Sequence, residues 1–175
     1  MLLLVGLGNP GSSYTNTRHN IGFKIIDAIN SHFKLSKQKP KFKGLLTTGN
    51  IDEKKIYAIK PLTFMNNSGT AIKELIDYFK IDAKDVFVFH DDLDIDFGKI
   101  KTKFGGSSAG HNGIESIDKF IGKDYSRVRI GIGHPKKKKK VNNHVLEDFK
   151  EDEEEKINEI TENIVKQLPT LIGKK

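Results

Sequence analysis

Residues 2–22 read LLLVGLGNPGSSYTNTRHNIG, and the rest of the chain is organised around this stretch. Its first part, Leu2 to Val5, is a short apolar run of the kind that forms a buried strand. Among the polar residues that follow the run, five are candidates for function: Asn9, Tyr14, Arg18, His19 and Asn20. Because open α/β sheets bind ligands at the carboxyl ends of their strands, we expect a functional site here.

Helix and strand patterns alternate through the remainder of the chain. Apolar residues at helical spacing predict helices from about Asn20 to Phe33, behind Ser68, from His111 onward and from about residue 150. Strand patterns occupy residues 45–51, 55–59, 86–89, 98–104 and 127–133. The sequence therefore predicts a single α/β domain over residues 1–175, a three-layer sandwich in which helices flank a mixed, mostly parallel twisted sheet.

Local signals add three expectations. Asn20 and Ser68 are expected to cap the helices that follow them. Residues 34–44 and the glycine-rich segment 105–110 are expected to be loops, the second of them mobile. Pro169 is expected to kink or end the C-terminal helix.

The composition is that of a globular protein. Hydrophobic residues make up 36% of the 175 residues and charged residues 30%. The longest apolar run is far shorter than the roughly 20 residues of a membrane span, and the N-terminus lacks the features of a signal peptide, so we expect a cytoplasmic protein without membrane contact. Because the chain has no cysteine, it has no disulfide and no thiolate metal site.

Charge is distributed unevenly along the chain. Residues 147–162 contain nine acids and two lysines, a local net charge of −7, while the whole chain carries +7. The remainder therefore carries +14. A surplus of this kind is typical of proteins that bind a polyanion.

The segment Gly6-Leu7-Gly8-Asn9-Pro10-Gly11 matches the G-x-G-x-x-G pattern of dinucleotide-binding folds, but its surroundings do not fit. Pro10 removes one of the amides that such a loop directs at a pyrophosphate, and helical spacing begins only about ten residues later. The acidic residue that should end a second strand is also missing. A turn that orients Asn9 is the better interpretation, and a dinucleotide-dependent oxidoreductase stays open as an alternative.

His19 is the candidate base. Four further polar residues lie at junctions between predicted elements: Asn9, Asn66, Asp91 and Asn112. A histidine held by a carboxylate at one ring nitrogen can deprotonate water at the other. Asparagine side chains can stabilise a developing oxyanion. This set predicts direct attack by water, without a serine or cysteine nucleophile.

A metal site is a second interpretation of part of this set. The cluster His90-Asp91-Asp92-Leu93-Asp94 offers several metal-binding side chains. However, neighbouring residues on a strand point to opposite faces, and no histidine pair has the four-residue helical spacing of a zinc site. From the residues alone, a metal site and a polar turn both stay open.

The predicted strand at 98–104 has one basic face, formed by Lys99, Lys101 and Lys103, and Arg129 lies on a nearby predicted strand. This face is suited either to bind phosphate or simply to be solvated. The run Lys136 to Lys140 is interpreted as a charged loop that adds salt-sensitive attraction to nucleic acid.

Several motifs keep a fixed order along roughly residues 1–146. They are GNPG at 8–11, Tyr14, TRHN at 17–20, TFMNNSG at 63–69, HDDLD at 90–94, GHNG at 110–113 and RIGIGHP at 129–135. In these motifs the chain closely resembles the bacterial-type peptidyl-tRNA hydrolases. The resemblance implies an enzyme that hydrolyses the ester between a peptide and the 3′ end of tRNA, with no metal and no cofactor.

The resemblance also implies roles for individual residues. His19 would be the general base, Asp91 would hold it in its basic tautomer, and Asn9 would distinguish a peptidyl from a free aminoacyl group. The residues that would bind the peptidyl and 3′-terminal parts of the substrate are Tyr14, Phe64, Asn66, His111 and Asn112. Those that would meet phosphates of the acceptor stem are Lys101, Lys103 and Arg129. The expected partner is thus peptidyl-tRNA, bound by a monomer through its acceptor stem and 3′ end.

Some segments depart from the family pattern. Ser107-Ser108-Ala109 stands where the family is richer in glycine, and the lysine run and the sequence after Leu146 are also distinctive. A non-catalytic RNA-binding module on the same scaffold stays open as a further alternative.

Overall fold

The computed structural model describes residues 1–135 and 140–173, and one seven-stranded sheet runs through it. The strands are β1 (Leu2–Gly6), β2 (Lys39–Lys41), β3 (Gly44–Ile51), β4 (Lys54–Pro61), β5 (Val86–Asp92), β6 (Ile100–Phe104) and β7 (Ser126–Gly131). They pair in the order β2-β3-β4-β1-β5-β7-β6. The pairs β4-β1, β1-β5 and β5-β7 are parallel, and β2-β3, β3-β4 and β6-β7 are antiparallel, so only β3 and β6 run against the common direction. The predicted mixed, mostly parallel sheet is confirmed.

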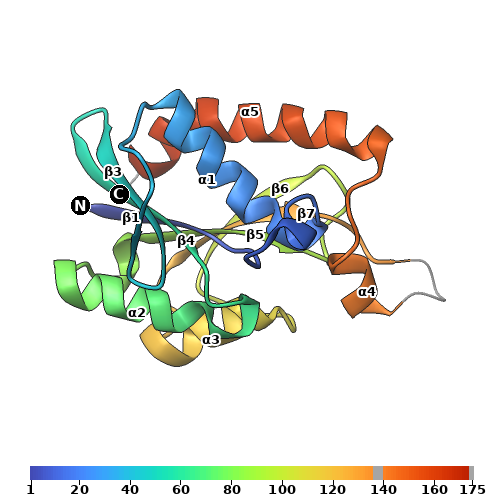
Figure 1. Ribbon diagram of the computed structural model, residues 1–175, viewed down its shortest axis with the longest axis horizontal. Coiled ribbons are helices and arrows are strands. Elements are labelled where there is room, and N and C mark those ends of the chain that lie inside the picture. The colour runs from blue at the N-terminus through green and yellow to red at the C-terminus, as the bar shows by residue number, and fades with distance from the viewer. Residues whose placement is uncertain (136–139, 174–175) are drawn as a thin grey trace.

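Helices cover both faces of this sheet. They are α1 (Ile21–His32), α2 (Ser68–Phe79), α3 (Asn112–Ile121), α4 (Val141–Val145) and α5 (Glu151–Gly173), with short 3-10 turns η1 (Ser12–Tyr14), η2 (Arg18–Asn20), η3 (Met65–Asn67) and η4 (Ala83–Asp85). Figure 1 shows α1 and α5 on one face and α2 and α3 on the other, with α4 at one end of the molecule. This is the three-layer arrangement that the sequence predicts.

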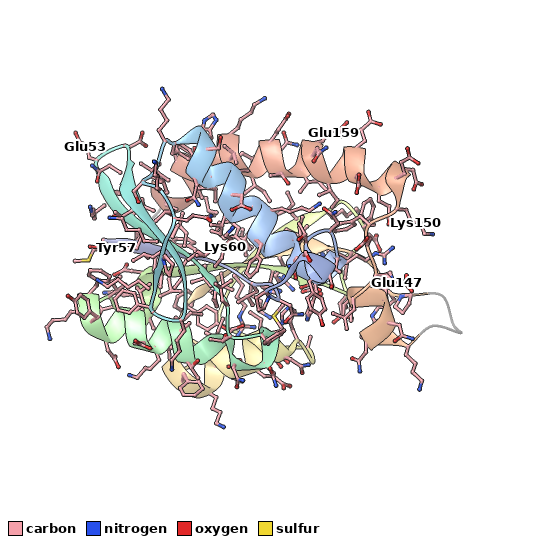
Figure 2. All side chains as sticks on the ribbon, in the orientation of Figure 1. Glu53, Tyr57, Lys60, Glu147, Lys150 and Glu159 are labelled. Atoms are coloured by element: carbon pink, nitrogen blue, oxygen red, sulfur yellow. The ribbon has the colours of Figure 1, made fainter. Side chains whose placement is uncertain are left out.

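Strand alternation divides the core into two halves. On β5, Phe87 and Phe89 pack with the layer of α1 and α5, whereas Val86 and Val88 pack with that of α2 and α3. Both faces of the central strands are therefore apolar, as expected for a sheet covered on each side. Helix α5 turns its apolar residues toward this core, and Figure 2 shows Glu159 on its outer side.

Some local predictions are wrong. Residues 39–41, predicted as loop, form the edge strand β2, whose side chains are all exposed. Asn20 occupies the N-cap of α1 without a side-chain capping bond, and Ser68 is the first residue of α2 rather than its cap. Pro169 does not end α5, which continues to Gly173 because buried Leu168 and Ile172 keep its last turn packed on the core; a kink at Pro169 stays a prediction. Of the predicted lysine loop, Lys136 to Lys139 lie outside the described residues.

The carboxyl ends of β1, β4, β5 and β7 meet at one edge of the sheet, because these strands run the same way. The polar junctions after these strands therefore lie in one region. None of the helices in 1–135 and 140–173 combines the length and apolar character needed to cross a membrane.

Candidate active site

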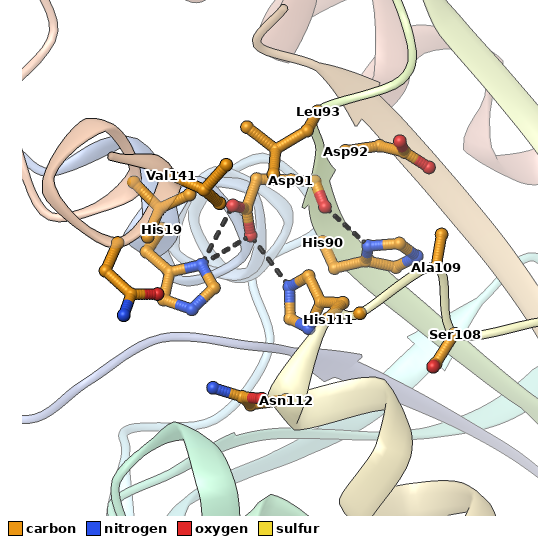
Figure 3. Close-up of a pocket in the computed structure, with 13 residues that line it drawn as sticks. His19, His90, Asp91, Asp92, Leu93, Ser108, Ala109, His111, Asn112 and Val141 are labelled. Atoms are coloured by element: carbon orange, nitrogen blue, oxygen red, sulfur yellow. Dashed lines mark hydrogen bonds and ion pairs between the residues drawn. The ribbon is translucent and has the colours of Figure 1, made fainter. Parts of the chain in front are cut away.

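His19 and Asp91 form the centre of the site. His19 lies on η2, just before α1, and Asp91 lies near the end of β5. Nδ1 of His19 is 2.9 Å from Oδ1 and 2.8 Å from Oδ2 of Asp91, and both side chains are buried (Figure 3). Since a carboxylate can only accept, Nδ1 carries the proton and donates it. The other ring nitrogen, Nε2, is then the basic atom of neutral His19.

His111 makes a second contact with the same carboxylate. Its Nε2 is 2.9 Å from Oδ1 of Asp91, and its Nδ1 accepts from the amides of Gly113 and Ile114, which caps α3. A nitrogen that accepts two amide protons carries no proton of its own, so neutral His111 holds its proton on Nε2 and donates it to Asp91. The local sequence His-Asn-Gly thus places the ring by the ordinary chemistry of a helix N-terminus.

The charges of the site reinforce one another. Burial by itself would raise the pKa of Asp91, but the nearby His19 and His111 imidazoles outweigh burial and hold that pKa well below its usual range. Burial likewise would lower the pKa of His19, but the Asp91 charge and hydrogen bond raise it above 6.5. The pair therefore consists of a firmly ionised carboxylate and an imidazole that gains basicity from it.

Asn9 is fixed by three hydrogen bonds, one to its side chain and two to its main chain. Its Oδ1 accepts from the amide of Met65 at 2.7 Å. Its own amide donates to Oδ1 of Asn20, and its carbonyl accepts from Nδ2 of Asn20, at 2.8 and 2.9 Å. After Gly11 the chain forms only the short 3-10 turns η1 and η2 before α1 begins at Ile21, so the glycine-rich turn presents Asn9 and does not form a dinucleotide loop.

Two cavities meet at His19. An open groove of about 340 Å³ is lined by Asn9, Phe64, Asn66, Asn112 and their neighbours in η3 and α4. A smaller inner pocket of about 60 Å³ lies between the Asp91 region, the loop before His111, and α4 (Figure 3). His19 and Asn112 line both cavities, so a substrate in the groove would meet the basic nitrogen where the two cavities join.

The remaining residues expected at the substrate surround this groove. Phe64 is exposed, and its ring stands edge-on to that of Tyr14, with centroids 6.5 Å apart. Asn66 lies on η3 and Asn112 is the first residue of α3, and both side chains are exposed to solvent at the groove. The structure thus brings together the side chains that the sequence places at three separate junctions.

The expected phosphate-binding residues lie at the far edge of the sheet. Lys101 and Lys103 are exposed on β6, and Lys101 is directly opposite Arg129 on β7. Arg129 is also 3.7 Å from a carboxylate oxygen of Asp92. Lys103 is instead opposite buried Arg127, whose guanidinium donates to the Ser107 carbonyl and to Asp118. Lys101 and Arg129 therefore form the closer pair.

The metal interpretation does not fit the geometry of HDDLD. Asp94 pairs with His134 and Asp92 with Arg129, so these carboxylates point away from Asp91. Ligand atoms of His19, Asp91 and His111 do lie within 4.8 Å of one another. However, the nitrogen that His111 presents carries its proton, and Nδ1 of His19 also donates, so neither offers a lone pair to a cation there.

Arg18 is a structural residue of the site, and the sequence places it there without assigning it a role. Its buried guanidinium donates to the His144 carbonyl at 3.1 Å and forms ion pairs with Glu147 and Glu153. The amide of Arg18 donates to the Glu147 carbonyl at 3.0 Å. These bonds attach the segment before His19 to α4, which lines both cavities. The only sequence signal was the position of Arg18 beside His19.

Comparison with known proteins is consistent across sequence and structure. The family model described as Peptidyl-tRNA hydrolase matches residues 3–175. The peptidyl-tRNA hydrolase of Pelagibacter ubique is 72% identical over all of this chain and 94% of its own length, and that of Bartonella quintana is 47% identical over 98% and 89%. A crystal structure of the peptidyl-tRNA hydrolase from Acinetobacter baumannii superposes with a TM-score of 0.93 at 36% identity, covering 99% of this chain and 89% of that one.

Proposed function

Because this chain belongs to the peptidyl-tRNA hydrolase family, we propose that it hydrolyses the ester between a peptide and the 3′ end of tRNA, with His19 as general base. The observation that carries the proposal is the bond from Nδ1 of His19 to the buried Asp91 carboxylate at the junction of two cavities. This bond leaves Nε2 free to accept a proton from water.

The chemistry follows from that geometry. Nε2 of His19 takes a proton as water attacks the ester carbonyl, and Asp91 stabilises the imidazolium that forms. Asn66 and Asn112, at the groove, donate hydrogen bonds near the ester, where negative charge develops on the carbonyl oxygen. When the tetrahedral intermediate collapses, His19 returns the proton to the leaving ribose oxygen. The products are a peptide with a free carboxylate and a tRNA with a free 3′-terminal hydroxyl.

Substrate recognition is proposed to use two surfaces. Asn9, Tyr14, Phe64 and His111, together with the two asparagines above, bind the peptidyl and 3′-terminal parts of the substrate. Asn9 selects an acylated peptidyl group. Its side chain is held in place by the Met65 amide, so it can hydrogen-bond to a peptide group of the substrate that an aminoacyl group with a free amine lacks. Lys101, Lys103 and Arg129 bind phosphates of the acceptor stem.

The test compares the parent with His19→Ala and with His32→Ala, a control at an exposed histidine on α1. Each protein is incubated with peptidyl-tRNA or aminoacyl-tRNA, with and without a chelator, and release of deacylated tRNA is followed. We expect the parent and the control to cleave only peptidyl-tRNA, at the same rate with the chelator, while His19→Ala binds tRNA without turnover. Full activity of His19→Ala would remove the proposed base, and an inactive parent that still binds RNA would favour a binding module.

A further inference from the structure

His90 is a buried titratable residue that the proposed mechanism gives no chemical step. It is 3% exposed and precedes Asp91 on β5. Both the His90 and the Asp91 side chains line the inner pocket, at the end of the strand. Nδ1 of His90 is 2.7 Å from the backbone oxygen of Asp91, and so donates to it.

His90 also packs against His111. The two ring centroids are 5.0 Å apart with an interplanar angle of 72°, and on its other side His111 lies 4.9 Å from the ring of His19. Figure 3 shows the three imidazoles in a row with His111 in the middle. The helix amides and Asp91 hold the two nitrogens of His111, and His90 closes the side away from His19. His90 therefore restricts movement of the His111 ring toward that side.

We propose that His90 is a positioning residue for the Asp91 carboxylate, acting through the Asp91 main chain and through the ring of His111. The proposal rests on the function assigned to His19 and Asp91 above. His90 fixes the backbone from which Asp91 projects and the ring that occupies Oδ1. The carboxylate is then held in the orientation in which both of its oxygens face Nδ1 of His19.

The charge state of His90 fits this role. Burial, together with the neighbouring His111 and Arg127, lowers the pKa of His90 to about 3 against the opposing effect of Asp91, so the ring is neutral near pH 7. A neutral ring does not compete with His19 for the negative charge of Asp91. Because the N–H at Nδ1 already donates a hydrogen bond to the Asp91 carbonyl, His90 has no proton to offer a substrate. It is therefore not a catalytic residue.

The test uses two substitutions at His90, one that keeps a hydrogen-bond donor and one that removes it. His90→Asn keeps a donor close to the position of Nδ1, whereas His90→Leu keeps bulk without a donor. The titration of His19 is followed by NMR without substrate, and kcat and KM are then measured on peptidyl-tRNA. In His90→Leu we expect the pKa of His19 to fall by roughly half a unit. We expect kcat to fall by roughly tenfold with KM unchanged, less than the roughly 10²–10⁴-fold that a general base supplies. His90→Asn should recover most of both.

A purely structural role predicts another outcome. His90→Leu would then lower the urea midpoint, like the core control Ile117→Val on α3, and leave the His19 titration and kcat of the folded enzyme unchanged. That result would overturn the proposal. Because the titration needs no substrate, it is separate from the proposed function, which fails if the parent does not hydrolyse peptidyl-tRNA.

The parent protein provides a test that does not depend on folding of the variants. At neutral pH its NMR spectra should show neutral His90 protonated on Nδ1 and His111 protonated on Nε2. A His90 that titrates near the ordinary value of 6.5, or that is protonated on Nε2, would overturn the proposal whatever the variants do.

Discussion

Replacing Asp91 by asparagine removes the charge on which the basicity of His19 depends. In the parent, both carboxylate oxygens lie within 2.9 Å of Nδ1 of His19. The asparagine amide presents one acceptor, its oxygen, and one donor, its NH₂ group. If the oxygen faces Nδ1 of His19, His19 keeps only one of its two acceptors, and if the NH₂ group faces it, two N–H groups oppose each other. His111 competes for the one oxygen that stays, because it also donates to Oδ1 in the parent.

The magnitude follows from the imidazolium that forms during the reaction. Two unit charges about 4 Å apart attract by about 4 kcal/mol at an effective dielectric constant of about 20. At about 1.4 kcal/mol per tenfold change in rate, loss of this attraction lowers kcat by roughly 10³-fold. Burial of His19 stays, so its pKa falls from above 6.5 in the parent to below 6.5 in the variant. The rise of rate with pH therefore moves to lower pH while the plateau drops.

The assay is hydrolysis of peptidyl-tRNA by Asp91→Asn over a pH range on both sides of the ordinary histidine value. Asp94→Asn, which alters an exposed carboxylate paired with His134, is the matched control and should behave as the parent. If Asp91→Asn kept kcat within about threefold of the parent, or if its pH profile did not move, the Asp91 charge would not be the source of His19 basicity.

Three further predictions concern residues other than His19 and Asp91. The double variant Lys101→Gln, Lys103→Gln should raise KM for peptidyl-tRNA at constant kcat. The slope of log KM against log salt concentration should fall by roughly 0.7–0.9 for each phosphate contact that is lost. An unchanged slope over a salt series would show that neither lysine belongs to the surface that binds tRNA. Arg18→Met should lower the free energy of unfolding by roughly 3 kcal/mol, because Glu153 and the His144 carbonyl lose the buried guanidinium. Glu153→Gln in the same chain should restore part of this loss in urea titrations. Ala109 has a φ of 48°, so Ala109→Gly should relieve roughly 1 kcal/mol of left-handed backbone strain in the folded state. The glycine also adds conformational entropy of about the same free energy to the unfolded chain, so we expect an unchanged urea midpoint together with faster amide exchange in residues 105–110. A large loss of stability would contradict this reasoning.

The fold could be predicted where packing leaves a periodic trace. Val86 to Phe89 is apolar on both faces because both faces are covered, and this is visible in the sequence. Strand β2 could not be found in this way, since Lys39, Pro40 and Lys41 are exposed and bury nothing that would set a period of two. Pro169 does not end α5, because a single lost helical hydrogen bond near the end of the helix weighs less than the continued burial of its apolar residues.

The candidate site could be predicted as residue types at strand ends, but not as contacts. His19 and Asp91 are 72 positions apart, and only the parallel order of β1 and β5 explains why their junctions coincide. Arg18 shows the limit clearly, because its partners His144, Glu147 and Glu153 lie more than 120 residues away in segments without a motif. Nothing local to either segment encodes that attachment.

The shared carboxylate raises the question of why His19, and not His111, would take up the proton. Both rings donate to Asp91, so the charge of Asp91 favours a proton on either. The difference lies at the opposite nitrogens. Nδ1 of His111 accepts from two amides at the start of α3, where the helix dipole also disfavours positive charge, so a second proton would have to displace both bonds. His19 lines both cavities, and the proposed mechanism places the attacking water at its Nε2. The helix thus makes His111 a fixed donor that helps hold Asp91, and it leaves His19 as the ring through which Asp91 can act on a substrate.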